Sequence, residues 1–293
     1  MQALTIPFHA GPISIVADCP QGEGLLRRLA VVLELETTDC TENIAQNAVV
    51  FLSNKPPKGE WRTWEGAVRL PAKVFWRPEE GKFHYQLEEE INYADDAPLC
   101  WRTLVRVFHQ CASNRILLTD SLQMHGALLR MNDSAIILFA NCGVGKSTAC
   151  GRFERGGGKV LGDDKIMLHL AEDGTVYAQP APTWSRPIFS PKMHFAFSQV
   201  LPLRGLFRLT RGKGDEIHPA SAVIWHAELL QGSFNYFERP LDWADADLHR
   251  RISARNVILI DRLWKLFPPL EIAGDLNGNL YGNLSAWLND HET

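Results

Sequence analysis

The residues with the clearest chemical character lie in one short segment, residues 140–148, which reads Ala-Asn-Cys-Gly-Val-Gly-Lys-Ser-Thr. An apolar run suited to a β-strand, residues 135–139, precedes it, and a segment with helical character follows until three glycines at 156–158. Backbone N–H groups converge at the N-terminus of a helix, where the helix dipole also favours negative charge. The order of strand, glycine loop and helix therefore predicts a site for a phosphate chain.

The residues of this segment have different predicted roles in binding phosphate and metal. Gly143 and Gly145 let the backbone approach phosphate oxygens without a Cβ in the way, Lys146 can reach the terminal phosphates, and the Ser147 hydroxyl can ligate Mg²⁺. The segment departs from the full Walker A pattern because Ala140 replaces the first glycine, which makes the opening of the loop less permissive. A glycine-rich turn that caps an ordinary helix is the alternative, and the agreement of strand, loop and helix disfavours it. We expect nucleotide phosphates to be bound by Gly143, Val144, Gly145, Lys146, Ser147 and Thr148.

Two adjacent carboxylates, Asp163 and Asp164, follow Lys146 by 17 and 18 positions, after one helix and one returning strand. In a phosphate-loop α/β architecture that strand ends on the same side of the sheet as the loop, so its carboxylates can face the phosphates. One can hold Mg²⁺ beside Ser147 and the other can accept a proton from an attacking hydroxyl. Neighbouring side chains on an ideal strand point to opposite faces, so both can serve one site only if the strand breaks there. An Asp-Asp pair alone is typical of a surface turn, and its position favours a functional role here.

Three motifs together resemble a known family: His125-Gly126, the 143–148 segment, and Gly162-Asp163-Asp164. With 21 positions from His125 to Lys146 and 17 from Lys146 to Asp163, they resemble the HPr kinase/phosphorylase family, whose catalytic domain shares a fold with phosphoenolpyruvate carboxykinase. The resemblance covers mainly residues 123–180 and extends less closely to about residue 230. There, segments 205–209 and 215–219 are similar to shortened HPr kinase-like kinases of peptide-modification gene clusters. Among these, the sequence is most similar to the ScmC group of radical-SAM cassettes and to the lasso-peptide kinases.

The resemblance implies roles for these residues. Asp163 would be the general base, Asp164 and Ser147 the metal ligands, and His125 a residue that faces the phosphates or orients the base. The implied catalytic set is Asp163, His125 and Lys146. A lone histidine beside a glycine on a strand is otherwise typical of a buried core residue. The sequence lacks the family's further acidic residue downstream of the Asp pair and its C-terminal region, which argues against HPr as substrate and against the reverse phosphorylase reaction.

The chain as a whole is expected to be of the α/β class (α+β overall), with a smaller N-terminal α+β domain at 1–114 and an HPr kinase-like catalytic domain at 115–293. Apolar patterning predicts strands within 5–17 and at 48–53, a hairpin around 74–85, and helices at 23–36 and 99–112. Beyond these it predicts a strand at 124–131 in a hairpin with 134–139, a strand at 159–162, a hairpin at 166–178, helices at 220–230 and 247–266, a strand at 270–272 and a closing helix at 284–288.

Composition excludes several classes of protein. A net charge of −4 and 45% hydrophobic residues are typical of a globular protein that binds neither nucleic acid nor a membrane surface. No apolar run approaches the roughly 20 residues that a membrane span needs, and the N-terminus lacks the basic start of a signal peptide. We therefore expect a cytoplasmic protein, and the sequence is compatible with a homo-oligomer. The six cysteines form no C-x-x-C pair and no zinc spacing, which predicts free thiols.

One stretch has unusual charge, because residues 174–214 contain no Asp or Glu but six cations, namely Arg186, Lys192, Arg204, Arg208, Arg211 and Lys213. Two interpretations are open. In the first, these cations lie on exposed strands and pair with acids elsewhere, such as Glu79, Glu80 or Glu88. In the second, they form a positive wall that steers an acidic peptide or a carboxylate to the site, with Arg186 and Arg208 raising acceptor affinity.

These observations predict an ATP- and Mg²⁺-dependent kinase that transfers the γ-phosphoryl group to a Ser or Thr hydroxyl of a small peptide or protein. The resemblance implies a part in ribosomal peptide maturation beside radical-SAM partners. A kinase for a free small molecule, such as an amino acid or a sugar alcohol, is the first alternative because the same site serves any hydroxyl. A non-catalytic nucleotide-binding component of a maturation complex is the second. Ala140 and the missing downstream acid favour it, whereas the intact Lys146 and Asp pair argue against it.

Overall fold

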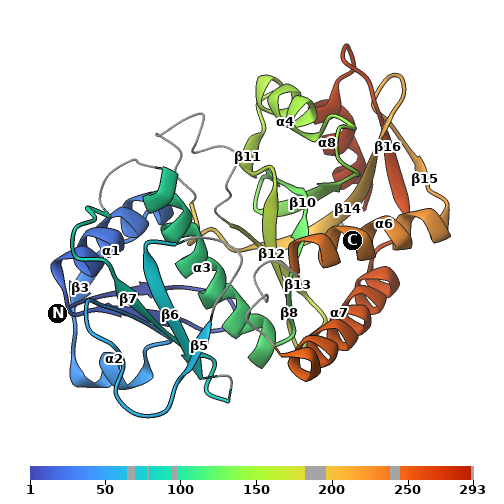
Figure 1. The fold of residues 1–293 in the computed structure, drawn as a ribbon. Helices are drawn as coiled ribbons and strands as arrows, with labels where there is room; N and C mark the ends of the chain where they lie inside the picture. Colours follow the sequence, from blue (N-terminus) through green and yellow to red (C-terminus); the bar gives the residue numbers. More distant parts are fainter. Residues whose placement is uncertain (65–69, 78, 94–97, 182–195, 238–244, 292–293) are drawn as a thin grey trace. The chain divides into compact units, whose positions relative to one another are not determined.

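The computed structural model describes the 293-residue chain except for residues 65–69, 78, 94–97, 182–195, 238–244 and 292–293. The described residues form a mixed α/β structure with two sheets and seven helices (Figure 1). They divide into two compact units. Unit 1 holds Met1–Thr119 with the described parts of 182–198 and 240–249, and unit 2 holds Asp120–Ala181, the described part of Gln199–Arg239, and 250–291.

Unit 1 is built on a seven-stranded sheet with the order β3-β1-β2-β4-β7-β6-β5. Its strands are β1 (Gln2–Ile6), β2 (Ile13–Ala17), β3 (Thr37–Asp39), β4 (Val50–Ser53), β5 (Arg62–Trp64), β6 (Ala72–Arg77) and β7 (Lys82–Leu87). Strands β2, β4 and β7 run parallel, and β6 and β7 form the hairpin predicted around 74–85. The predicted strands within 5–17 and at 48–53 are confirmed as β1, β2 and β4.

Three helices complete unit 1: α1 (Pro20–Leu33), α2 (Glu42–Asn47) and α3 (Pro98–Leu118). The Cys19 side chain caps α1 by accepting from the Gly22 N–H, and Pro20 at the first position suits a helix start. The helix predicted at 99–112 is confirmed as α3. Asn114, where the sequence suggests the domain boundary, lies inside this helix, and the whole helix belongs to unit 1.

Unit 2 is built on a nine-stranded sheet with the order β11-β9-β10-β14-β13-β12-β8, to which β16 and then β15 add alongside β14. Its strands are β8 (Ser121–His125), β9 (Ala127–Met131), β10 (Ser134–Phe139), β11 (Lys159–Gly162), β12 (Lys165–Leu170), β13 (Val176–Pro180), β14 (Leu201–Arg211), β15 (Glu216–Pro219) and β16 (Leu270–Gly274). Its helices are α4 (Lys146–Arg155), α6 (Ala222–Phe237), α7 (Ala246–Leu266), whose first residues fall in unit 1, and α8 (Leu280–His291).

Helices cover both faces of the unit 2 sheet (Figure 1). On one face, the fully buried Trp225 of α6 packs edge-on against Phe139 of β10 and against Trp264 of α7. On the other, Phe153 of α4 and Leu284 of α8 belong to a second buried cluster. Burial of apolar side chains on both faces suits the continuous apolar run of β10, because a strand covered on both sides has no polar face. No helix among the described residues is long and apolar enough to cross a membrane.

The strand predicted at 124–131 is in fact two strands that separate at Gly126. The Gly126 N–H donates to the Asp164 carbonyl at 3.1 Å, and a Cβ at this position would lie 3.2 Å from both the Ile137 Cγ2 and the Leu138 carbonyl oxygen. Strand β8 therefore pairs with β12, whereas β9 pairs with β10 in the predicted hairpin. The prediction failed because residues suited to a strand lie on both sides of the glycine, whereas the strand that supplies the hydrogen bonds changes there from β12 to β10.

A buried ion pair ties helix α4 to two loops of unit 2. The Arg152 guanidinium donates to an Asp215 carboxylate oxygen, and the two side chains are 7% and 0% exposed. Arg152 also donates to the Gly278 carbonyl at 3.2 Å. The second oxygen of Asp215 accepts from the Asp275 N–H at 2.9 Å. One carboxylate thus fixes the connections after β14 and after β16 against α4.

We expect Asp215→Ala to lower the free energy of unfolding by about 3–5 kcal/mol, because it leaves a buried guanidinium without its counter-charge. Arg152→Met in the same chain should recover part of that loss, since the uncompensated charge disappears. Chemical denaturation of the two single variants and the double variant measures this coupling. Asp133→Ala is the matched control, because its carboxylate is 98% exposed in its pair with Arg130 and should contribute under about 1 kcal/mol. Additive losses in the double variant would contradict the assignment.

Candidate active site

The glycine loop, residues 140–145, connects the end of β10 to the start of α4. Gly143 and Gly145 have φ angles of +80° and +118°, in the region that favours glycine over other residues. A Cβ at either position would meet nothing within 4 Å. The backbone conformation, and not crowding, is therefore what requires glycine here, and the loop leaves free space above its amides at the N-terminus of α4. This is the arrangement that favours an anion.

Lys146, the first residue of α4, is buried, with 8% exposure. Its Nζ lies 2.6 Å from the Nε2 of His125 and 3.3 Å from the Ala140 carbonyl oxygen. Burial lowers the pKa of Lys146, and attraction to Asp164 opposes that change. The ammonium has three donors, of which these contacts use two. The third remains for a further oxygen.

The opposite edge of the His125 ring faces Asp164. Its Nδ1 lies 2.9 Å from the Asp164 carbonyl oxygen and 3.0 Å from the Asp164 Oδ1. Because an ammonium can only donate, a charged Lys146 requires Nε2 to accept, and Nδ1 of the neutral ring then carries the proton and donates to Asp164. Lys146, His125 and Asp164 thus form a continuous chain of hydrogen bonds.

Asp163 and Asp164 lie in a bend between β11 and β12, so the predicted break of the strand is confirmed. Strand β11 is antiparallel to β9, which is antiparallel to β10. Strands β11 and β10 therefore run in the same direction and end at the same edge of the sheet. There the Ser147 Oγ lies 3.4 Å from the Asp163 Oδ2. The two carboxylates diverge, with Asp163 toward Ser147 and Asp164 toward His125.

A cavity of about 780 Å³ adjoins the glycine loop. Its lining includes Gly143, Val144, Gly145 and Thr148 and residues from the ends of β14 and β16. The Arg211 Nη2 donates to the Gly143 carbonyl at 2.9 Å, so the end of β14 holds the loop. Arg211 was not predicted as a site residue, although it belongs to the basic stretch without acids.

The four described cations of that basic stretch have different surroundings. Arg208 pairs with Glu271 at 2.7 Å and with Glu228 at 2.8 Å. This agrees with the interpretation in which the cations pair with acids elsewhere, although the partners differ from the suggested ones. Glu80, one of those suggested, pairs instead with Arg77 and Lys82. Arg186 and Lys192 lie outside the described residues.

The oxygen donors near the loop suit a hard cation. Ser147 and Asp163 offer a hydroxyl and a carboxylate, the ligand types that Mg²⁺ prefers. No group of three or more His, Cys, Asp or Glu side chains in the described part of the chain is arranged to hold a metal ion. A Mg²⁺ ion that arrives with a nucleotide needs only one or two protein ligands, because phosphates and water supply the others. All six cysteines are free thiols, as predicted, and Cys142 in the loop is exposed.

Comparison with known proteins places these residues in a family. The family model described as SynChlorMet cassette protein ScmC matches residues 90–286. A search of curated proteins found no match. Among solved structures, the Hpr(Ser) kinase/phosphatase from Coxiella burnetii is similar over 30% of this chain and 65% of its own, with 13% identity and a TM-score of 0.23. The model match spans well over half of the chain and includes every predicted site residue, and the chain therefore belongs to the ScmC family.

Proposed function

We propose that unit 2 is an ATP- and Mg²⁺-dependent kinase that transfers the γ-phosphoryl group to a hydroxyl. The observation that carries this proposal is the pairing of the glycine loop with two divergent carboxylates. Ser147 of α4 faces Asp163, while Lys146 is linked through His125 to Asp164. A loop that only bound nucleotide would not need a basic and an acidic group joined in this way. The site offers the groups that bind phosphate, hold a cation and accept a proton.

Binding is proposed to begin with the phosphate chain over the amides of the glycine loop. The Lys146 ammonium donates its remaining hydrogen to a terminal phosphate oxygen. The 780 Å³ cavity beside the loop accommodates the rest of the nucleotide, and its size is within the range of small-molecule sites. Arg211 stabilises the loop conformation through the Gly143 carbonyl.

Transfer then needs one bond to form and one to break. The acceptor oxygen attacks the γ-phosphorus, the bond to the β–γ bridging oxygen breaks, ADP leaves, and the acceptor proton passes to a carboxylate. A bound Mg²⁺ would lower the charge on the phosphate oxygens. The buried ammonium of Lys146 stabilises negative charge on the transferred group more strongly than an exposed one, because water screens it less.

The roles of general base and metal ligand can be assigned to the two carboxylates in two ways. The family resemblance implies Asp163 as base and Asp164 as metal ligand. The contact between Ser147 and Asp163 favours the exchanged version, because the hydroxyl that is expected on the metal lies beside Asp163 and not beside Asp164. In that version Asp164 takes the proton, and His125 orients it through Nδ1. We propose the exchanged version as the one that the distances favour.

The acceptor is proposed to be a Ser or Thr of a peptide. The family description, a cassette protein, is compatible with a peptide made and modified by neighbouring gene products, such as radical-SAM enzymes. The non-catalytic component remains the second candidate, favoured by the absence of a further acid between residues 174 and 214. Phosphate transfer from radiolabelled ATP to the cassette's precursor peptide tests the first candidate. Tight ATP binding without any transfer would favour the second.

Lys146→Met should weaken Mg-ATP binding at least ~10-fold, which corresponds to the loss of one charge-assisted hydrogen bond. The variant should unfold within about 1 kcal/mol of the parent, because an apolar side chain of similar length removes a costly buried charge. Calorimetric titration and thermal melting measure the two effects. An unchanged affinity in a folded variant would refute the phosphate site.

Asp163→Asn and Asp164→Asn should separate metal binding from proton transfer, because Asn keeps the shape of Asp but is a weak ligand and no base. We expect Asp163→Asn to raise the Mg²⁺ concentration needed for ATP binding. Asp164→Asn should retain Mg-ATP binding and lose at least ~100-fold in transfer rate. The reverse result would restore the assignment implied by the resemblance, and two fully active variants would exclude the mechanism.

Arg211→Gln should weaken Mg-ATP binding by about 3- to 10-fold, since the Gly143 carbonyl loses its charged donor and the loop loses its preferred conformation. Arg204→Gln is the matched control on the same strand, because Arg204 lies near the opposite end of β14. Calorimetry of both variants compares them directly. Equal losses would show that the effect comes from general charge and not from the loop contact.

A further inference from the structure

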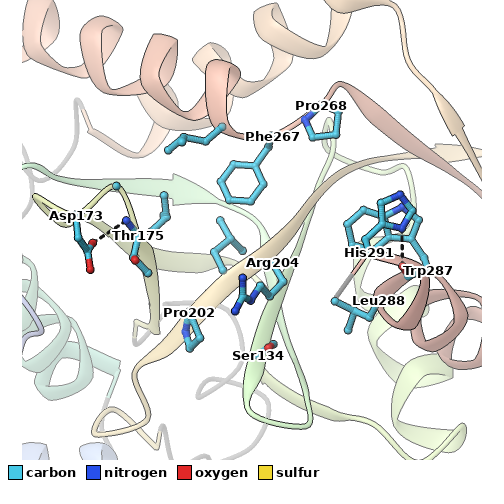
Figure 2. A pocket seen from close by; sticks show the side chains of 14 residues that line it. Ser134, Asp173, Thr175, Pro202, Arg204, Phe267, Pro268, Trp287, Leu288 and His291 are labelled. Carbon is cyan, nitrogen blue, oxygen red and sulfur yellow. Dashed lines mark hydrogen bonds between the residues drawn. The ribbon is translucent and has the colours of Figure 1, made fainter. Parts of the chain in front are cut away.

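Figure 2 shows the residues that line a second cavity, of about 860 Å³, within unit 2. This cavity lies at the end of the sheet away from the glycine loop. Ser134, the first residue of β10, and Arg204, near the start of β14, are part of its lining. The glycine loop follows the last residue of β10, and Arg211 ends β14. The two cavities therefore lie at opposite ends of the same pair of parallel strands and share no lining residue.

The wall of this second cavity is mainly apolar, and part of it is buried and closely packed. Phe267 and Leu288 are 9% and 5% exposed. Trp287 packs edge-on against the fully buried Phe207, with ring centroids 4.8 Å apart. Leu266 at the end of α7 is 48% exposed. A cavity of this size with apolar walls and a few polar groups is typical of small-molecule sites.

The cation of this lining, Arg204, is exposed and has no counter-charge among the described residues. Arg208, four positions along the strand, pairs with two glutamates, whereas among the described residues no acidic side chain lies within ion-pair distance of Arg204. In Figure 2, Asp173 lies beside Thr175, and Arg204 lies apart from both. The Thr175 N–H donates to the Asp173 carboxylate at 2.8 Å. The carbonyl groups at the C-terminal end of α8 could in principle offset the charge of a cation such as Arg204. One of them, the Trp287 carbonyl, already lies 2.8 Å from the Nδ1 of His291.

We infer that this cavity binds a small amphipathic carboxylate, whose apolar body lies against Phe267 and Leu288 and whose anionic group pairs with Arg204. A guanidinium binds a carboxylate through two parallel hydrogen bonds, and the exposed position of Arg204 leaves its donors open to a ligand that enters from solvent. The Ser134 hydroxyl supplies a further donor on the lining. The inference does not depend on the proposed kinase activity.

The test uses three probes with the same eight-carbon chain and different head groups, namely octanoate, octan-1-ol and octylammonium, in calorimetric titrations of the full chain below their aggregation limits. Octanoate should bind saturably and more tightly than both others. Arg204→Gln should weaken octanoate binding at least ~10-fold and leave the thermal midpoint unchanged. Mg-ATP affinity should also stay unchanged in this variant, because the glycine loop lies at the other end of β14.

Two variants of the exposed Leu266 locate the site. Leu266→Asp should weaken octanoate binding more than Leu266→Asn, since both remove the same apolar contact and only one adds a negative charge to the wall. Arg211→Gln, at the far end of β14, should bind octanoate as the parent does. The inference is overturned if octanoate shows no saturable binding, if octylammonium binds more tightly, or if Arg204→Gln binds octanoate like the parent chain.

Discussion

The candidate site depends on one buried ammonium. Lys146 is the first residue of α4, and burying its charge carries a desolvation penalty that only nearby acceptors can offset. The Ala140 carbonyl at the end of β10 and the Nε2 of His125 at the end of β8 supply those acceptors. The ammonium thereby ties the start of α4 both to the opening of its own loop and to the end of β8, 21 positions earlier in the sequence. Because lysine has no acceptor, the same contact sets the tautomer of His125 and directs its other nitrogen to Asp164.

Strand β14 lies beside the strand that leads into the glycine loop and links it to the rest of the sheet. It is the longest strand among the described residues and pairs with β10, β13 and β16. Its arginines have different tasks along its length. Arg208 forms ion pairs with Glu228 of α6 and Glu271 of β16, and Arg211 donates to the Gly143 carbonyl. A single strand therefore connects the core of unit 2, the glycine loop and the second cavity.

Local patterns predicted the elements that depend on local chemistry. The glycine loop, the start of α4 near Lys146, the break at Asp163-Asp164 and most hairpins follow from turn residues and apolar periodicity. Strand β14 received no bounds from the sequence, although apolar residues alternate along it from Leu201 to Leu209. Its pairing register shifts opposite Ala135 and Ile136 and skips Arg204, and such a shift against a neighbouring strand cannot be read from the alternation. The partners of Arg208 and the separate directions of the two aspartates were also out of reach, since both depend on contacts between distant segments.

The structure explains why alanine is tolerated at position 140, where the Walker A pattern has its first glycine. Among the described residues only Glu34, Asn132 and Asp215 have positive φ angles without being glycine. Ala140 therefore lies in a conformation open to any L-residue, and its Cβ does not strain the loop. The residue is 8% exposed and belongs to the buried cluster beneath α4, so its methyl group adds apolar contact. In this loop glycine is required at positions 143 and 145, where the φ angles are positive and the sequence has glycine. Ala140 accepts from Lys146 through its backbone carbonyl, which any residue could supply.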